Sequence, residues 1–206
     1  MKIDIASHPA CNIYNTWKEY LPGQKQLAIL DISEIKTLQD YVSNFMNPTA
    51  RNRYRYSCRH YTTQQAEYNK YLDEIHEINI SAPVRQNNPM REHYVQKPTP
   101  RSEEKIICEE HYTRFYGCFS NSTEKLVAYA TIHVSGELCA VTQIIGHADY
   151  LRDDIMLNLF ATLVEFAINA GIKCMLYSRW TDGTDGLRHW KYSVGFRCDS
   201  VELINT

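Results

Sequence analysis

A short basic and aromatic segment, Arg51–Tyr61, carries the side chains best suited to contacting phosphate groups. Its sequence, RNRYRYSCRHY, interleaves four arginines and one histidine with tyrosines. Arginine neutralises backbone phosphates and tyrosine stacks on bases, so the segment is a candidate nucleic-acid contact. A second interpretation is an edge strand whose arginines pair with the acidic residues of positions 67–74. The candidate substrate-binding residues here are Arg53, Arg55, Arg59 and His60.

A second group of hydrogen-bonding side chains lies in the long polar segment Asn79–Pro100, which contains four prolines. Loops of this length inside a compact domain are usually functional or disordered. The hydrogen-bonding side chains are concentrated in Asn79–Tyr94, where prolines also stiffen the backbone. We expect this stretch either to cover a substrate as a lid or to be an ordinary solvated loop. Its candidate substrate-binding residues are Ser81, Arg85, Gln86 and Tyr94.

Acid–base chemistry is available at His147 and Asp149, which follow an apolar run that ends at Ile145. A carboxylate two residues from a histidine can orient the imidazole as a general base. The same histidine could instead do no more than end a strand. We treat both residues as candidate catalytic groups.

A glycine-rich segment, Ser178–Gly186, follows the apolar run Ile172–Tyr177. The carboxyl end of a strand beside a diverging neighbour is where open α/β sheets bind ligands. Ser178 and Arg179 are therefore candidate substrate-binding residues. A surface turn made of two Asp-Gly pairs is the alternative interpretation.

Composition narrows the class of protein. The 206 residues are 44% hydrophobic and 22% charged, as expected for a soluble globular protein with a core. The formal net charge of −2 provides no overall attraction to nucleic acid. The seven cysteines contain no Cys-x-x-Cys pair, which argues against a disulfide framework or a zinc ribbon, and we expect no metal. No apolar run approaches the ~20 residues of a membrane span, and no secretory segment is recognisable, so we expect a cytoplasmic protein without a membrane partner. The oligomeric state stays open.

The elements that must position these residues centre on the middle of the chain. Two β-rich runs, Leu126–Val134 and Leu138–Ile145, flank a short turn and predict a β-hairpin. A helix follows, with Asp153 as its expected N-cap and Gly171 at its left-handed C-terminal position. The helix is apolar over most of its circumference, which predicts that it is buried.

Periodicity predicts the other elements. The run Ile172–Tyr177 is expected to be a strand parallel to the second hairpin strand, because a helix of ~17 residues separates them. The remaining strands are expected at Leu27–Ile32, at Arg53–Tyr56 with one basic and one aromatic face, at either Ile106–Cys108 or Tyr112–Phe119, and at Arg197–Ile204. The remaining helices are expected at Glu34–Met46, Thr62–Ile78 and Leu187–Val194.

The order of these elements resembles the GNAT fold of N-acetyltransferases over residues 27–204. The segment Leu187–Phe196, LRHWKYSVGF, is similar to the family's short helix that ends in Gly-Phe before the last strands. The resemblance implies an α/β (α+β) protein with a GNAT-like mixed sheet, a central buried helix and an N-terminal helical elaboration. We expect residues 1–206 to form a single such domain.

The start of the buried helix departs from the pattern of acyl-CoA enzymes. Family members carry glycines there, which let backbone N–H groups approach the pyrophosphate. This chain has Asp153 and Asp154 instead, and carboxylates at a helix N-terminus repel a pyrophosphate. The pair Trp190-Lys191 looks more like the Fem-type branch, which takes its acyl group from aminoacyl-tRNA. A GNAT-like group of phage DNA-modification proteins is a further resemblance. Lys191 is accordingly a candidate catalytic residue that binds the donor.

The resemblance implies an acyl or aminoacyl transferase that moves a small group from acyl-CoA or aminoacyl-tRNA to an amine acceptor, with a nucleic acid as a further candidate partner. Backbone N–H groups of the strand Val141–Ile145 would hold the carbonyl oxygen, and Gln143 in that strand is a candidate substrate-binding residue. His147, or a water ordered by Asp149, would take the proton. The alternative is a non-catalytic nucleic-acid or protein-binding module on a decayed GNAT fold.

Overall fold

The computed structural model describes residues 1–102 and 108–204. Its main feature is a seven-stranded mixed sheet, in which only β8 and β9 run parallel. The strands lie in the spatial order β10 (Arg197–Asp199), β2 (Leu27–Asp31), β9 (Cys174–Arg179), β8 (Leu138–Gly146), β7 (Leu126–Ser135), β6 (His111–Ser120) and β3 (Tyr61–Gln65).

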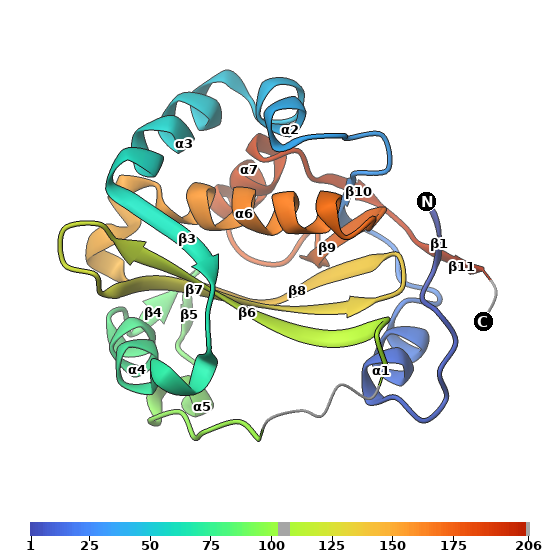
Figure 1. The fold of residues 1–206 in the computed structure, drawn as a ribbon, viewed down its shortest axis with the longest axis horizontal. Coiled ribbons are helices and arrows are strands. Elements are labelled where there is room, and N and C mark those ends of the chain that lie inside the picture. Colours follow the sequence, from blue (N-terminus) through green and yellow to red (C-terminus); the bar gives the residue numbers. More distant parts are fainter. Residues whose placement is uncertain (103–107, 205–206) are drawn as a thin grey trace.

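Helices cover both faces of this sheet (Figure 1). One face carries α2 (Leu38–Asn44), α3 (Pro48–His60), α6 (Ile155–Asn169) and α7 (Asp185–Ser193). The other face carries α1 (Asn12–Tyr20), α4 (Leu72–Ile80) and the short α5 (Glu92–Val95). The largest hydrophobic cluster lies between the sheet and α6, and two smaller clusters lie under α1 and α4.

The central hairpin and the buried helix confirm the sequence prediction. β7 and β8 pair antiparallel, and α6 buries nine of its side chains. Gly171 has φ +70°, the left-handed conformation that ends a helix and suits glycine. The N-cap prediction was wrong by one residue, because Asp154 occupies that position with φ +58° and makes no capping bond. Asp153 instead ends a 3-10 helix, and its carboxylate accepts a hydrogen bond of 2.5 Å from the Tyr61 hydroxyl.

The basic segment is the main error of the sequence prediction. The expected strand Arg53–Tyr56 lies within α3, because Asn47 caps that helix through a bond from the Ala50 N–H and Pro48 stands at its first position. An alternation over only four residues was a weaker signal than this helix start. The expected helix Thr62–Ile78 was wrong in its first part, which forms β3, while its later part lies in α4.

Other predicted boundaries shifted. The helix expected at Glu34–Met46 is shortened to α2, and α7 begins two residues before the expected helix Leu187–Val194. The long polar segment contains the small hairpin β4 (Val84–Arg85) and β5 (Asn88–Pro89), besides α5. Of the two strands proposed near residue 110, Tyr112–Phe119 lies in β6, and most of Ile106–Cys108 falls outside the described residues.

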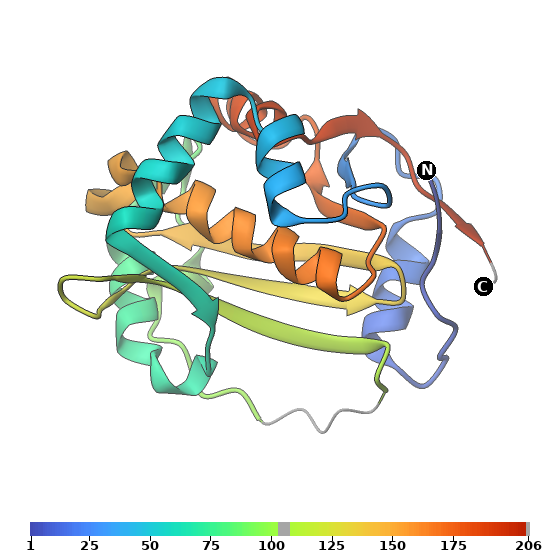
Figure 2. The ribbon, with the colours of Figure 1, turned by 45° about the horizontal axis from the view of Figure 1, so that its top comes forward.

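The final predicted strand is divided between two sheets. Arg197–Asp199 joins the large sheet as β10, and β11 (Glu202–Ile204) pairs in parallel with β1 (Lys2–Asp4). Figure 2 shows this two-stranded sheet beside α1. Within the described part of the chain, no helix combines the length and the apolar character needed to cross a membrane.

Candidate active site

The parallel strands β8 and β9 pair over only three residues and then diverge. Pairing runs from Leu138 to Ala140, opposite Cys174 to Leu176. β8 then carries a bulge at Thr142, whose hydroxyl bonds the Thr131 carbonyl, and bulges bend strands away from their neighbours. Beyond Leu176, β9 has its own irregularity against β2, and Ser178 adopts φ +58°. Among residues 1–102 and 108–204, the edge of β8 from Val141 onward therefore has no strand partner on the β9 side.

A cleft of about 460 Å³ opens where the two strands separate. Its walls are mostly apolar, and the β4–β5 hairpin lies over it. Gly146 belongs to its lining, and a side chain at this position would collide with Leu151 and Met156. The lining residues are Ala82, Val84, Arg85, Gln86, Ile144, Ile145, Gly146, Leu151, Met156, Tyr177, Thr184, Gly186, Leu187 and Trp190.

Arg85 ties the hairpin to the end of β8. Its guanidinium donates to the carbonyls of Gly146 and Ile78, at 2.9 and 2.8 Å, and to the Ser81 hydroxyl at 3.0 Å. The same hydroxyl accepts from the Ala148 N–H. Burial lowers the pKa of Arg85. The predicted pair Ser81 and Arg85 thus lies at the cleft.

Gln86 closes the cleft on the other side. Its side-chain oxygen accepts from the Thr184 hydroxyl at 2.6 Å and from the Thr184 N–H at 3.3 Å. Gln86 and Asn87 both have positive φ, as the two central residues of a tight hairpin turn require. This contact joins the β4–β5 hairpin to the loop after β9, although almost one hundred residues separate them in the sequence.

Two buried N–H groups in the cleft lining have no partner among the described residues. They are the Nε of Arg85 and the indole Nε1 of Trp190. An unpaired buried donor loses its hydration without compensation, which costs ~1–3 kcal/mol. Because Arg85 and Trp190 belong to the cleft lining, these two N–H groups are candidates for binding a ligand oxygen.

Lys191 is fully buried beside the cleft wall. Its ammonium donates to the carbonyls of Arg179 at 2.5 Å and Asp182 at 3.3 Å, and it lies 5.4 Å from the centre of the Tyr177 ring. Burial lowers the pKa of Lys191, and the charge of Asp182 opposes this shift. Ser178 bonds the Asp182 carboxylate, so Ser178, Arg179 and Lys191 together hold the loop that follows β9.

His147 and Asp149 lie just past the end of β8, outside the lining of the cleft. The His147 Nδ1 accepts from the Asp149 N–H at 3.3 Å and lies 3.9 Å from the Asp149 carboxylate. The Asp149 side chain is 85% exposed. His147 is half-buried against Tyr150, with the ring centres 5.5 Å apart. The two predicted catalytic residues therefore do meet, at the mouth rather than the centre of the site.

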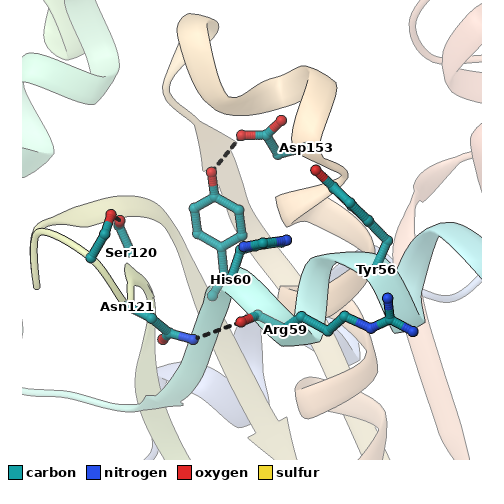
Figure 3. Close-up of a pocket in the computed structure, with 8 residues that line it drawn as sticks. Tyr56, Arg59, His60, Ser120, Asn121 and Asp153 are labelled. Carbon is teal, nitrogen blue, oxygen red and sulfur yellow. Dashed lines mark hydrogen bonds between the residues drawn. The ribbon is translucent and has the colours of Figure 1, made fainter.

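The basic residues of α3 form a separate surface near the start of α6. Arg53 pairs with Asp154 at 3.2 Å, whereas Arg55 and Arg59 are exposed. A second cavity, of about 380 Å³, lies at the C-terminal end of α3, where Figure 3 shows Arg59, His60 and Asp153 around it. The His60 ring packs on Tyr56 with the ring centres 4.9 Å apart.

Gln143 and Tyr94 meet in a third place, a groove of about 950 Å³ over β6, β7 and β8. The Gln143 amide donates to the Tyr94 hydroxyl at 3.1 Å, and its oxygen accepts from Arg101 at 3.0 Å. Arg101 also lies 3.7 Å from the centre of the Tyr68 ring. The predicted site residues are thus distributed over the cleft, the α3 surface and this groove.

Sequence reasoning missed Arg101, Tyr177 and Trp190. No motif surrounds Arg101 in the sequence, and Tyr177 and Trp190 resemble core positions. The orphaned indole of Trp190 is visible only in the folded protein. In residues 1–102 and 108–204, no group of three or more histidine, cysteine, aspartate or glutamate side chains is placed to hold a metal ion.

Solved structures with this architecture are known, although no family model and no curated protein matches the sequence. FemX matches with a TM-score of 0.65 at 10% identity, over 84% of this chain and 59% of its own. L-PGS from Bacillus licheniformis matches with a TM-score of 0.55 at 14% identity, over 85% and 58%. A tandem GNAT protein from the clavulanic acid biosynthesis pathway matches with a TM-score of 0.51 at 9% identity, over 94% and 57%.

The chain spans less than two thirds of the length of each of these three structures. Identities of 9–14% establish a shared fold, not a shared reaction. The mixed sheet, the diverging parallel pair and the buried helix that follows β8 agree with this likeness. The protein therefore has a divergent GNAT-like fold.

Proposed function

We propose that this protein is an acyl or aminoacyl transferase that binds the transferred group in the cleft between β8 and β9. The observation that carries the proposal is the pair of unpartnered donors, Arg85 Nε and Trp190 Nε1, beside the unpaired edge of β8. Such donors, beside a mostly apolar cleft, are suited to stabilising a carbonyl oxygen that becomes negative.

The reaction would follow from this geometry. The acceptor amine attacks the donor carbonyl carbon, and the negative oxygen is held by N–H groups of Val141–Ile145 with the help of the two side-chain donors. The tetrahedral intermediate then expels the donor's leaving group. His147, at the mouth of the cleft, is the candidate base for the amine proton. Its Nδ1 would take that proton in place of the 3.3 Å hydrogen bond from the Asp149 N–H, and the Asp149 carboxylate, 3.9 Å away, would then stabilise the charged ring. Lys191 would act indirectly, by holding the loop after β9.

We favour aminoacyl-tRNA over acyl-CoA as the donor. The start of α6 is occupied by Asp154 and its ion pair with Arg53, and a pyrophosphate there would have to displace both side chains. The exposed arginines of α3 lie beside this helix start and could contact RNA phosphates. The name FemX also belongs to the Fem type, the branch that the sequence resemblance connects with aminoacyl-tRNA.

Replacing Trp190 by phenylalanine tests the cleft directly. The variant keeps the aromatic packing against Phe160 and Tyr177 but lacks the indole N–H. We expect a 3′-aminoacylated RNA minihelix to bind about five- to tenfold more weakly, the equivalent of one hydrogen bond of ~1–1.5 kcal/mol. Fluorescence anisotropy with labelled minihelix measures this.

Trp17→Phe is the matched control, because Trp17 also has a buried unpartnered indole N–H but belongs to the cluster under α1. Its affinity should stay within about twofold of the wild type. If the minihelix binds and both variants behave alike, RNA is bound without the cleft, and the alternative of a non-catalytic binding module gains support.

A further inference from the structure

Cys108 and His111 form a thiol–imidazole pair at the start of β6, away from the cleft. The Cys108 sulfur lies 3.1 Å from the His111 Nδ1. The backbone N–H of Glu110 also points to this sulfur, at 3.4 Å. Cys108 is partly exposed, whereas only 3% of His111 is accessible. Cys108 is therefore partly accessible to solvent, and its partner is fixed in the protein.

The orientation of His111 determines which of its nitrogens carries the proton. Its Nε2 lies 2.9 Å from the Ile5 carbonyl oxygen, which can only accept a hydrogen bond. The neutral ring must therefore carry its proton on Nε2, and the lone pair on Nδ1 faces the thiol. The Ser135 hydroxyl donates to the same carbonyl at 3.0 Å, which fixes this acceptor in place. Nδ1 is thus positioned to receive the thiol proton.

The other six cysteines lack this arrangement. Cys11, Cys118, Cys139 and Cys174 are buried, and burial raises the pKa of Cys118 and of Cys174 to about 12. Cys58 is exposed as a residue, but partial burial of its thiol raises its pKa. Cys198 is exposed and, within the described part of the chain, makes no hydrogen bond with a histidine. Thiolates, not thiols, are the reactive species, so a neighbouring base distinguishes Cys108 from the rest.

We propose that Cys108 is a modification site that undergoes thiol–disulfide exchange with small disulfides, with His111 as its base. The Cys108 thiolate attacks one sulfur of the disulfide, a new S–S bond forms and the old one breaks. The released thiolate takes the proton held on Nδ1 and leaves as a thiol. The products are one mixed disulfide and one free thiol, so the exchange needs no further oxidant.

The test is a competition among the cysteines of the folded wild type. The protein is treated at pH 7 with a limiting amount of 5,5′-dithiobis(2-nitrobenzoate), and mass spectrometry of its peptides locates the mixed disulfide over time. We expect Cys108 to react on the order of tenfold faster than Cys198, because a base fixed beside the sulfur raises the fraction of reactive thiolate. Equal or faster reaction at Cys198 or Cys58 overturns the proposal, because both are more exposed than Cys108.

His111→Gln isolates the role of the base. Glutamine can still donate from its amide to the Ile5 carbonyl but offers no equivalent of Nδ1. The Cys108 rate should then fall to that of Cys198, while Cys118, Cys139 and Cys174 stay unreactive and report an intact fold. An unchanged Cys108 rate in the folded variant contradicts the proposal. If the buried cysteines react, the variant is not correctly folded, and the proposal is then judged by the competition in the wild type.

Discussion

The buried side chain of Lys191 has a different role in the folded protein from the one that the sequence predicts. Lys191 was predicted to bind a donor molecule, and it makes its contacts with the protein itself. Its ammonium replaces water for two carbonyls in the loop between β9 and α7. The neighbouring Trp190 faces the cleft, so adjacent residues of one helix divide the structural and the binding role.

Lys191→Met should lower the free energy of unfolding by about 1–3 kcal/mol. The methionine fills a similar volume but leaves the Arg179 and Asp182 carbonyls without their donor. Urea unfolding followed by circular dichroism measures the change. Lys173→Met is the control, because Lys173 is half exposed and forms a surface ion pair with Glu137, and it should change stability by less than about 1 kcal/mol. Equal stability of the two variants would show that the carbonyls find other partners.

At the scale of elements, α3 and α6 meet where a GNAT-type acyl-CoA enzyme would bind its pyrophosphate. Figures 1 and 2 both place the end of α3 beside the beginning of α6. The contact is made by Arg53 with Asp154 and by Tyr61, just after α3, with Asp153. The same helix exposes Arg55 and Arg59, which are four residues apart and therefore on one side. One element thus both blocks the helix terminus and presents a basic surface.

Replacing Arg55 and Arg59 together by glutamine should weaken tRNA binding without unfolding the protein. In the described ranges, no carboxylate forms an ion pair with either side chain, so the melting temperature should barely change. The slope of log K against log salt should become less steep by roughly 0.7–0.9 for each lost phosphate contact. The double variant Lys25→Gln, Lys36→Gln removes the same charge elsewhere. If the arginine variant and this control have equal slopes of log K against log salt, α3 is not the surface that binds RNA.

Asp154→Gly tests the other role of this contact. We expect free acetyl-CoA to bind the wild type with a Kd around millimolar or weaker, about −4 kcal/mol. The glycine variant should bind it more tightly, because the carboxylate at the helix start is gone. The free energy of unfolding should change by no more than about 1 kcal/mol, because two effects oppose each other. Glycine adopts the positive φ of position 154 without strain, which stabilises the fold, and the lost ion pair with the exposed Arg53 destabilises it.

Titration calorimetry with acetyl-CoA checks this prediction, with Asp149→Ala as the control for net charge alone. An equal gain in the control would mean that the position at the helix start is unimportant. A micromolar Kd for the wild type would identify an ordinary acyl-CoA pocket and contradict our choice of donor.

At the scale of the whole molecule, the sheet and its helices keep several weak acids neutral in the folded state. Burial raises the pKa of Tyr177, of Cys118 and of Cys174 to about 12. In the unfolded chain these groups ionise near their ordinary pKa values, 10.0 for tyrosine and 9.0 for cysteine. The unfolded state therefore loses protons first as the pH rises, and ionisation favours unfolding.

These groups should leave the free energy of unfolding unchanged below about pH 9 and lower it between pH 9 and 12, by ~1.4 kcal/mol per pH unit for each group that ionises only on unfolding. Tyr177→Phe should make the fall between pH 10 and 12 shallower by one such contribution. Tyr192→Phe is the control, since Tyr192 is about half exposed and its loss should leave the slope unchanged. Urea titrations at several pH values measure both slopes, and identical slopes would contradict this account.

The sequence by itself determined the centre of this protein. The hairpin of β7 and β8, the buried α6, its end at Gly171 and the parallel β9 all follow from hydrophobic periodicity, turn residues and chain length, which act over short distances. Asn47 and Pro48 also mark the start of a helix in the sequence. The strand prediction for Arg53–Tyr56 instead followed the alternation of arginine and tyrosine after them, and it was wrong.

Only the tertiary structure decided how the candidate residues are grouped. The bulge at Thr142 separates β8 from β9, the contact of Gln86 with Thr184 covers the cleft, and β2 enters the sheet beside β9. These features depend on strand register and on side chains that meet across tens of residues of sequence, so no local pattern encodes them. The same reason explains why Arg85, Trp190 and the Cys108–His111 pair acquire a chemical meaning only after folding, when burial removes water and leaves one geometry for each donor and acceptor.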